Sequence, residues 1–113
     1  MATGPNVKDV TQAGFNQDII EHSKKQPVLV DFWAPWCGPC RAMSGVVDQV
    51  AAHVAGKASV VKVNVDEATD TARRFGIQSI PSFAVIKGGE VKETAVGVLP
   101  GQRLLDLLTP HLN

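Results

Sequence analysis

The hydrophobic residues of the chain form short continuous runs and also repeats at spacings of three and four. Two runs, 28–33 and 59–65, are apolar almost throughout, which predicts strands buried on both faces. The glycine pair in Lys87-Gly88-Gly89-Glu90 predicts a hairpin between two further strands. The predicted strands are residues 7–10, 28–33, 59–65, 82–86 and 91–96.

Apolar residues spaced three and four apart predict a helix after most of these strands. The longest pattern follows residues 28–33 and continues to about Ala55, where Gly56 is a typical helix stop. Shorter patterns follow Thr11, Asp66 and Pro100, and the side chains of Thr11 and Asp66 are suited to cap a helix N-terminus.

The predicted elements follow one another in the order βαβαβαββα. This order predicts an α/β domain with a mixed central β-sheet and helices on both faces, in which the early crossovers are parallel and right-handed and the last two strands are antiparallel. A chain of 113 residues is the size of a single domain, so we expect residues 1–113 to fold as one unit.

Charge and composition exclude several classes of partner. The 11 basic residues are balanced by 11 acidic ones, so no nucleic acid or anionic membrane is expected as a partner. No apolar run approaches the roughly 20 residues of a membrane span. Residues 1–6 lack the features of a secretory signal. We therefore expect a cytoplasmic protein, although an exported protein that had lost its leader would look the same.

The two cysteines, Cys37 and Cys40, lie where the apolar run 28–33 gives way to the long helix. A helix N-terminus stabilises a thiolate, and we expect Cys37 to be exposed there. Cys40 lies one turn further on, within reach of a disulfide. Pro39 favours the helical φ, and Gly38 leaves room for an incoming disulfide. The pattern predicts a redox-active dithiol.

Two other uses of these cysteines fit less well. A structural disulfide across so short a loop removes little chain entropy from the unfolded state. A metal site needs about four ligands, whereas the chain has no second cysteine pair and its histidines, His22, His53 and His111, are scattered. No metal site is expected.

Two longer stretches resemble the thioredoxin family. Residues 32–40 read Phe-Trp-Ala-Pro-Trp-Cys-Gly-Pro-Cys, and residues 75–83 read Phe-Gly-Ile-Gln-Ser-Ile-Pro-Ser-Phe. They occur in the family's order, followed by Gly88-Gly89 and Gly97, and the resemblance extends over about 7–112. It implies the thioredoxin fold and a protein-disulfide reductase.

The resemblance also implies a reaction and its partners. The Cys37 thiolate attacks a disulfide of a client protein, and Cys40 then attacks the resulting mixed disulfide. No Gly-x-Gly-x-x-Gly segment follows a predicted strand, so no bound cofactor is expected. Electrons would come from an NADPH-dependent thioredoxin reductase, and we expect a monomer.

Two isolated charges interrupt the apolar strands. Asp31 is the charged residue of run 28–33, and burial there would raise its pKa so that it could exchange a proton with Cys40. The resemblance assigns it that relay; the alternative is a solvated strand end. Lys62 is the corresponding charge in 59–65. The resemblance places it beside Asp31 as a tuning residue, but its long stem could also carry the ammonium to water.

The resemblance further implies a substrate-binding surface around the thiol. It assigns a cis bond to Ile80–Pro81, which would expose neighbouring backbone to an extended client segment, whereas sequence alone favours an ordinary trans proline. Trp36 would belong to this surface, with burial in the core as the alternative. The other apolar residues of the surface would be Ile80, Val96, Gly97 and Val98.

Some positions depart from the family pattern. Gly45 stands where relatives usually have a helix-kinking proline, so the shape of the long helix is open. Arg41 replaces a usual lysine, and Ser79 leaves the substrate preference open. Two rival functions also remain. One is a non-catalytic docking subunit, and the other is an oxidase or isomerase. The dipeptide Gly38-Pro39 between the cysteines resembles that of reductases and so favours a reductase.

Overall fold

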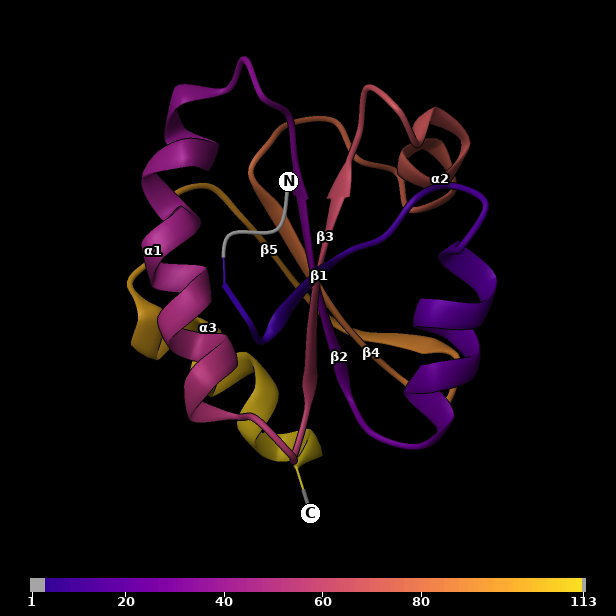
Figure 1. The fold of residues 1–113 in the computed structure, drawn as a ribbon, viewed down its shortest axis with the longest axis vertical. Coiled ribbons are helices and arrows are strands. Elements are labelled where there is room, and N and C mark those ends of the chain that lie inside the picture. Colours follow the sequence, from indigo (N-terminus) through magenta and orange to yellow (C-terminus); the bar gives the residue numbers. More distant parts are fainter. Residues whose placement is uncertain (1–3, 113) are drawn as a thin grey trace.

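The fold is a twisted five-stranded sheet between two layers of helices (Figure 1). It is seen in a computed structural model that describes residues 4–112. The strands are β1 (Val7–Asp9), β2 (Val28–Trp33), β3 (Ser59–Asn64), β4 (Ser82–Lys87) and β5 (Glu90–Val96), and the helices are α1 (Gly38–His53), α2 (Thr69–Arg74) and α3 (Gly101–Leu108). The order of elements confirms the predicted mixed α/β architecture.

The sheet has the strand order β1-β3-β2-β4-β5. β1, β3 and β2 are parallel, and β4 is antiparallel to both β2 and β5. β2 is therefore central, and all six of its residues are buried. This position explains why its sequence shows no polar alternation. In the register of β2 and β3, Asp31 lies opposite Lys62.

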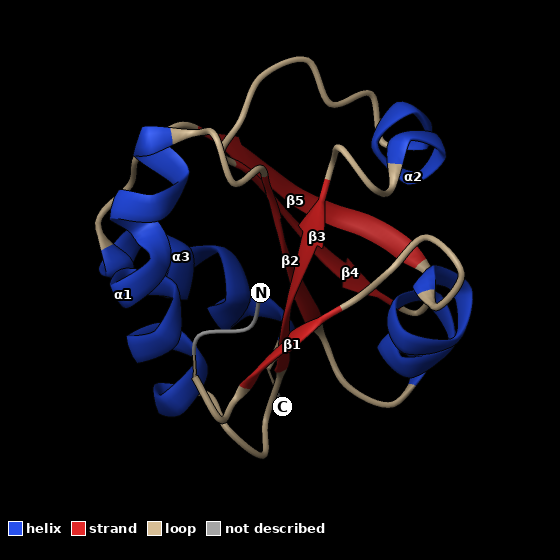
Figure 2. Cartoon of the chain, turned by 45° about the horizontal axis from the view of Figure 1, so that its top comes forward, coloured by secondary structure: helices blue, strands red, loops and turns tan. Residues whose placement is uncertain are grey.

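Each face of the sheet has its own hydrophobic core. α1 and α3 cover one face, while α2 and the helical segment after β1 cover the other (Figure 2). The first core joins Leu29 and Phe83 of the sheet to Met43 of α1 and Leu104 of α3. The opposite core gathers Phe15, Ile19, Val30, Phe32, Val61 and Ile86. None of the described helices is long and apolar enough to cross a membrane.

The segment after β1 differs from the predicted regular α-helix. It is a π-helix over Asn16–Glu21 followed by a 3₁₀ turn over His22–Lys24. The Ser23 hydroxyl donates to the Ile20 carbonyl within this segment and accepts from the Gly89 N–H of the β4–β5 turn. The bond from Gly89 ties this end of the segment to the β4–β5 turn.

Neither predicted capping residue caps a helix. The Thr11 hydroxyl accepts the Gly14 N–H at 3.2 Å and closes a turn before the π-helix. α2 begins after Ala68 and has no side-chain cap. The Asp66 carboxylate is used elsewhere, because it accepts a hydrogen bond from Trp36.

Helix α1 runs without interruption through Gly45. It ends at His53, two residues before the predicted end, and Gly56 follows with φ of +85°. A Cβ added at Gly45 would meet nothing within 4 Å. The structure therefore leaves room for a methyl group at this position.

We expect Gly45→Ala to stabilise the protein by about 0.5–1 kcal/mol, because alanine loses less backbone entropy in a helix. Urea unfolding should show a higher midpoint with an unchanged slope. Gly56→Ala is the matched control and should destabilise, since φ at Gly56 is +85°. A lower midpoint for Gly45→Ala would contradict this expectation.

Candidate active site

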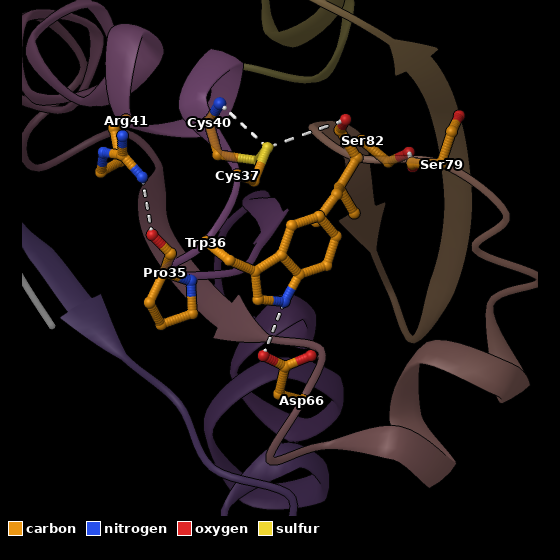
Figure 3. Close-up of a disulfide and its surroundings, with 9 residues drawn as sticks. Pro35, Trp36, Cys37, Cys40, Arg41, Asp66, Ser79 and Ser82 are labelled. Atoms are coloured by element: carbon orange, nitrogen blue, oxygen red, sulfur yellow. Dashed lines mark hydrogen bonds between the residues drawn. A yellow bond between two sulfur atoms is a disulfide. The ribbon is translucent and has the colours of Figure 1, made fainter.

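The two cysteines lie at the start of α1, where β2 ends (Figure 3). Cys37 is the N-cap residue, and Pro39 lies in the first turn. The two cysteines form a disulfide, with their Cα atoms 5.2 Å apart. The Cys40 backbone N–H donates to Cys37 Sγ at 3.1 Å. After reduction this N–H and the helix dipole favour a thiolate at Cys37.

The expectation that Cys37 is exposed is wrong for this disulfide form. Cys37 is 4% exposed and Cys40 is 3% exposed. Cys37 Sγ is covered on one side by Cys40 and on another by the Ile80 carbonyl oxygen, which lies 3.9 Å away. Exposure therefore does not separate the two cysteines, whereas the N-cap position does.

The Ile80–Pro81 segment lies against the cysteine pair, and its peptide bond is cis. The trans alternative is therefore excluded. The Pro81 carbonyl accepts the Gly97 N–H at 2.8 Å, and Ser82 pairs with Val96 in the sheet register. These pairings bring the end of β5 beside the cis-proline segment.

Trp36 lies outside the core and is 67% exposed. Figure 3 shows its indole directed toward Asp66, whose carboxylate accepts the Nε1–H at 2.9 Å. The indole, Ile77 and Ile80 line one apolar hollow. The remaining residues of the predicted surface are spread along the end of β5, where Val96 and Val98 are 61% and 62% exposed.

Asp31 is buried in the middle of β2, with 1% of its surface exposed. The alternative of a solvated strand end is therefore wrong. Within residues 4–112, its Oδ1 atom has no hydrogen-bond partner. Burial raises the pKa of Asp31 from 3.8 to about 7, and the nearby charge of Lys62 opposes that rise only in part. Such a carboxyl gains and loses a proton near neutral pH.

Lys62 is also buried, with 4% of its surface exposed. Its Nζ atom lies 4.4 Å from the centroid of the Trp33 ring. Trp33 packs with Ala34 and both cysteines. The contact between Trp33 and Lys62 depends on how β2 and β3 pair, so local sequence does not show it. The position of Trp33 two residues after Asp31 is the signal that could have indicated it.

Two further residues contact the active-site loop. Asp66 holds the Trp36 indole, although the sequence pattern predicts a helix cap for it. Arg41 donates from Nη1 to the Pro35 carbonyl at 2.9 Å, so its guanidinium lies along the loop before Cys37 (Figure 3). Both contacts tie the segment that carries Trp36 to neighbouring elements.

Comparison with known proteins agrees with this geometry. The thioredoxin family model matches residues 6–110. The chain is 48% identical to thioredoxin 1 of Synechococcus elongatus over 91% of its own length and 94% of that protein. It is 44% identical to a thioredoxin of Synechocystis over 99% of its own length and 100% of that protein. With thioredoxin M4, chloroplastic, of Arabidopsis thaliana, identity is 51% over 91% of this chain and 52% of that protein. The chain therefore belongs to the thioredoxin family.

Proposed function

We propose that the protein reduces disulfide bonds of client proteins through Cys37 and Cys40. The observation that carries the proposal is the Cys37 N-cap, where the Cys40 N–H points at Sγ at 3.1 Å. A thiolate favoured at this position is the nucleophile that thiol–disulfide exchange requires. Members of the thioredoxin family are disulfide oxidoreductases, and the chain has their paired cysteines at disulfide distance.

The reaction proceeds in two exchanges. The Cys37 thiolate attacks one sulfur of the client disulfide, and the other client sulfur leaves as a thiolate. Cys40 then loses its proton and attacks Cys37 Sγ, which releases the second client sulfur. Two electrons pass to the client, and the product is the Cys37–Cys40 disulfide seen in this structure.

Asp31 accepts the Cys40 proton in this scheme. The support is its burial together with a pKa of about 7, which suits a group that takes up and returns a proton near neutrality. Lys62, opposite Asp31 in the register, tunes that pKa by its charge. Gly38 and Pro39 shape the first turn of the helix between the two cysteines.

The client binds over the apolar surface beside Cys37. Trp36 supplies the largest exposed apolar side chain, and Ile80 joins it in one hollow. Pro81 shapes the segment that covers Cys37. At the end of β5, Gly97 has φ of +98°, which favours glycine. Val96 and Val98 flank it and complete the surface.

An NADPH-dependent thioredoxin reductase returns electrons to the oxidised pair, and the protein acts as a cytoplasmic monomer. Reduction by a reductase is general to the family, and NADPH as its electron source is our proposal. NADPH consumption with such an enzyme and this protein would test it. A ferredoxin-dependent reductase that alone supports turnover would contradict it. Gel filtration would test whether the protein is a monomer in solution.

Cys37 should be the first thiol alkylated in the reduced protein near neutral pH, because the helix N-terminus favours its thiolate. Brief treatment with iodoacetamide followed by peptide mass mapping measures the label on each cysteine. The Cys40→Ser variant should keep this reactivity, whereas Cys37→Ser should lose it. Early label mainly on Cys40 would reverse the assigned roles.

A redox titration separates a reductase from an oxidase or isomerase. A reductase of this type should have a two-electron midpoint more reducing than the glutathione couple. Equilibration with glutathione buffers, read out by trapping the free thiols, measures that midpoint. A midpoint more oxidising than glutathione would favour the oxidase or isomerase.

A further inference from the structure

Trp33 connects the cysteine pair to the buried charges of the sheet. Its side chain is 8% exposed and packs with Ala34, Cys37 and Cys40 at one end of β2. Asp31 lies two residues earlier in the same strand, so both side chains point to the sheet face covered by α1 and α3.

The side chain of Lys62 is directed toward this tryptophan. The backbone of Lys62 is paired with Asp31, yet its Nζ atom lies 4.4 Å from the Trp33 ring centroid. A cation over an indole face is attracted to the ring, and the attraction is stronger when both groups are removed from water. Both groups are buried here.

With the Lys62 ammonium over the Trp33 ring, the described part of the chain offers Asp31 no direct cationic partner. Among the residues that the structure describes, Asp31 Oδ1 has no hydrogen-bond partner and no ion pair joins Asp31 to Lys62. A direct ion pair typically lowers the pKa of a carboxyl by about 1–3 units. The charge of Lys62 offsets only part of the rise that burial causes, so the pKa of Asp31 is about 7.

We propose that Trp33 is a positioning residue, whose indole face holds the Lys62 ammonium and so prevents a direct ion pair between Lys62 and Asp31. Without the ring, the ammonium is free to turn toward the carboxylate. Asp31 then becomes a weaker base for the Cys40 proton. This consequence for turnover rests on the proposed function, but the titration of Asp31 does not.

Other groups that face Asp31 and Lys62 must be considered in any pH experiment. Asp9 of β1 pairs with Lys62 in the register, on the side opposite Asp31. Phe83 of β4 is the apolar partner of Asp31 on the remaining side. Cys40 of α1 packs with Trp33, but it does not titrate in the disulfide. The oxidised protein therefore gives the simplest titration.

The test is a ¹³C NMR titration of the Asp31 carboxyl in oxidised wild type, Trp33→Leu and Trp33→Phe. We expect the midpoint in Trp33→Leu to fall by about one pH unit. Trp33→Phe keeps an aromatic face and should titrate close to wild type, although both variants lose indole volume. Trp33→Met replaces Trp33→Leu if the latter does not fold.

The same substitution in a Lys62→Met background completes the test. Because Trp33 acts through the ammonium, Trp33→Leu should no longer lower the midpoint when Lys62 is absent. An unchanged midpoint in Trp33→Leu, or a fall that persists without Lys62, would overturn the proposal. If the midpoint falls but the pH profile of turnover does not follow it, the positioning role stands and the relay role of Asp31 fails.

Discussion

Cys40→Ser is expected to accumulate a covalent adduct with client proteins and to lose turnover down to background. Cys37 still attacks the client disulfide, since its N-cap position and the backbone N–H of residue 40 remain. The second exchange has no thiol, so the reaction stops at the mixed disulfide. Non-reducing gels followed by mass spectrometry would identify the adduct.

The matched control is Cys37→Ser, which should form little adduct although it keeps one thiol. Adding dithiothreitol should release the client from Cys40→Ser and recover the free variant. If neither variant traps a client disulfide, or if Cys37→Ser traps it better, the order of the two exchanges is wrong.

Asp31→Asn is expected to stabilise the protein above neutral pH and to slow turnover. The pKa of Asp31 rises from 3.8 to about 7 on folding, because burial penalises the carboxylate. The folded state thus binds more protons than the unfolded state between these values. The free energy of unfolding of the wild type is therefore highest below about pH 4 and falls as the pH rises toward 7. Above pH 7 it stays reduced, by at most about 4 kcal/mol.

Asparagine does not ionise, so the variant avoids this loss. The stability gap between Asp31→Asn and wild type should be small at pH 4 and should approach about 4 kcal/mol at pH 8. Turnover at neutral pH should fall by about tenfold or more, because asparagine cannot accept the Cys40 proton.

Urea unfolding at several pH values measures the difference in free energy of unfolding between Asp31→Asn and wild type. Asp70→Asn is a suitable control, since the side chain of Asp70 is 73% exposed and its removal should give no such pH dependence. A gap that does not change between pH 4 and pH 8, or full activity of Asp31→Asn, would exclude Asp31 as the relay.

The parts of the fold that follow from local sequence could be predicted. The apolar run 28–33 became β2 with both ends as predicted, because a strand buried on both faces needs apolar residues throughout. The long helix and the final hairpin likewise followed from periodicity and glycine positions. The cis bond at Pro81 was implied by the family resemblance and not by the residues alone.

The remaining features depend on contacts between distant segments. Asp66 has the side chain of a helix cap, but it lies beside Trp36 in the fold and bonds the indole. The burial of Cys37 comes from the segment around Ile80, which lies 43 residues further along the chain. The contact of Lys62 with Trp33 requires the β2–β3 register. Local patterns carry none of this information.

The central claim is that this cysteine pair reduces client disulfides catalytically. Insulin reduction with dithiothreitol as electron source tests it most directly, using wild type and Cys37→Ser/Cys40→Ser at equal concentration. We predict multiple turnovers by wild type and the uncatalysed rate for the double variant, with both proteins showing the same fold by circular dichroism. Equal rates for the two proteins would contradict the claim and would favour a docking function that needs neither thiol.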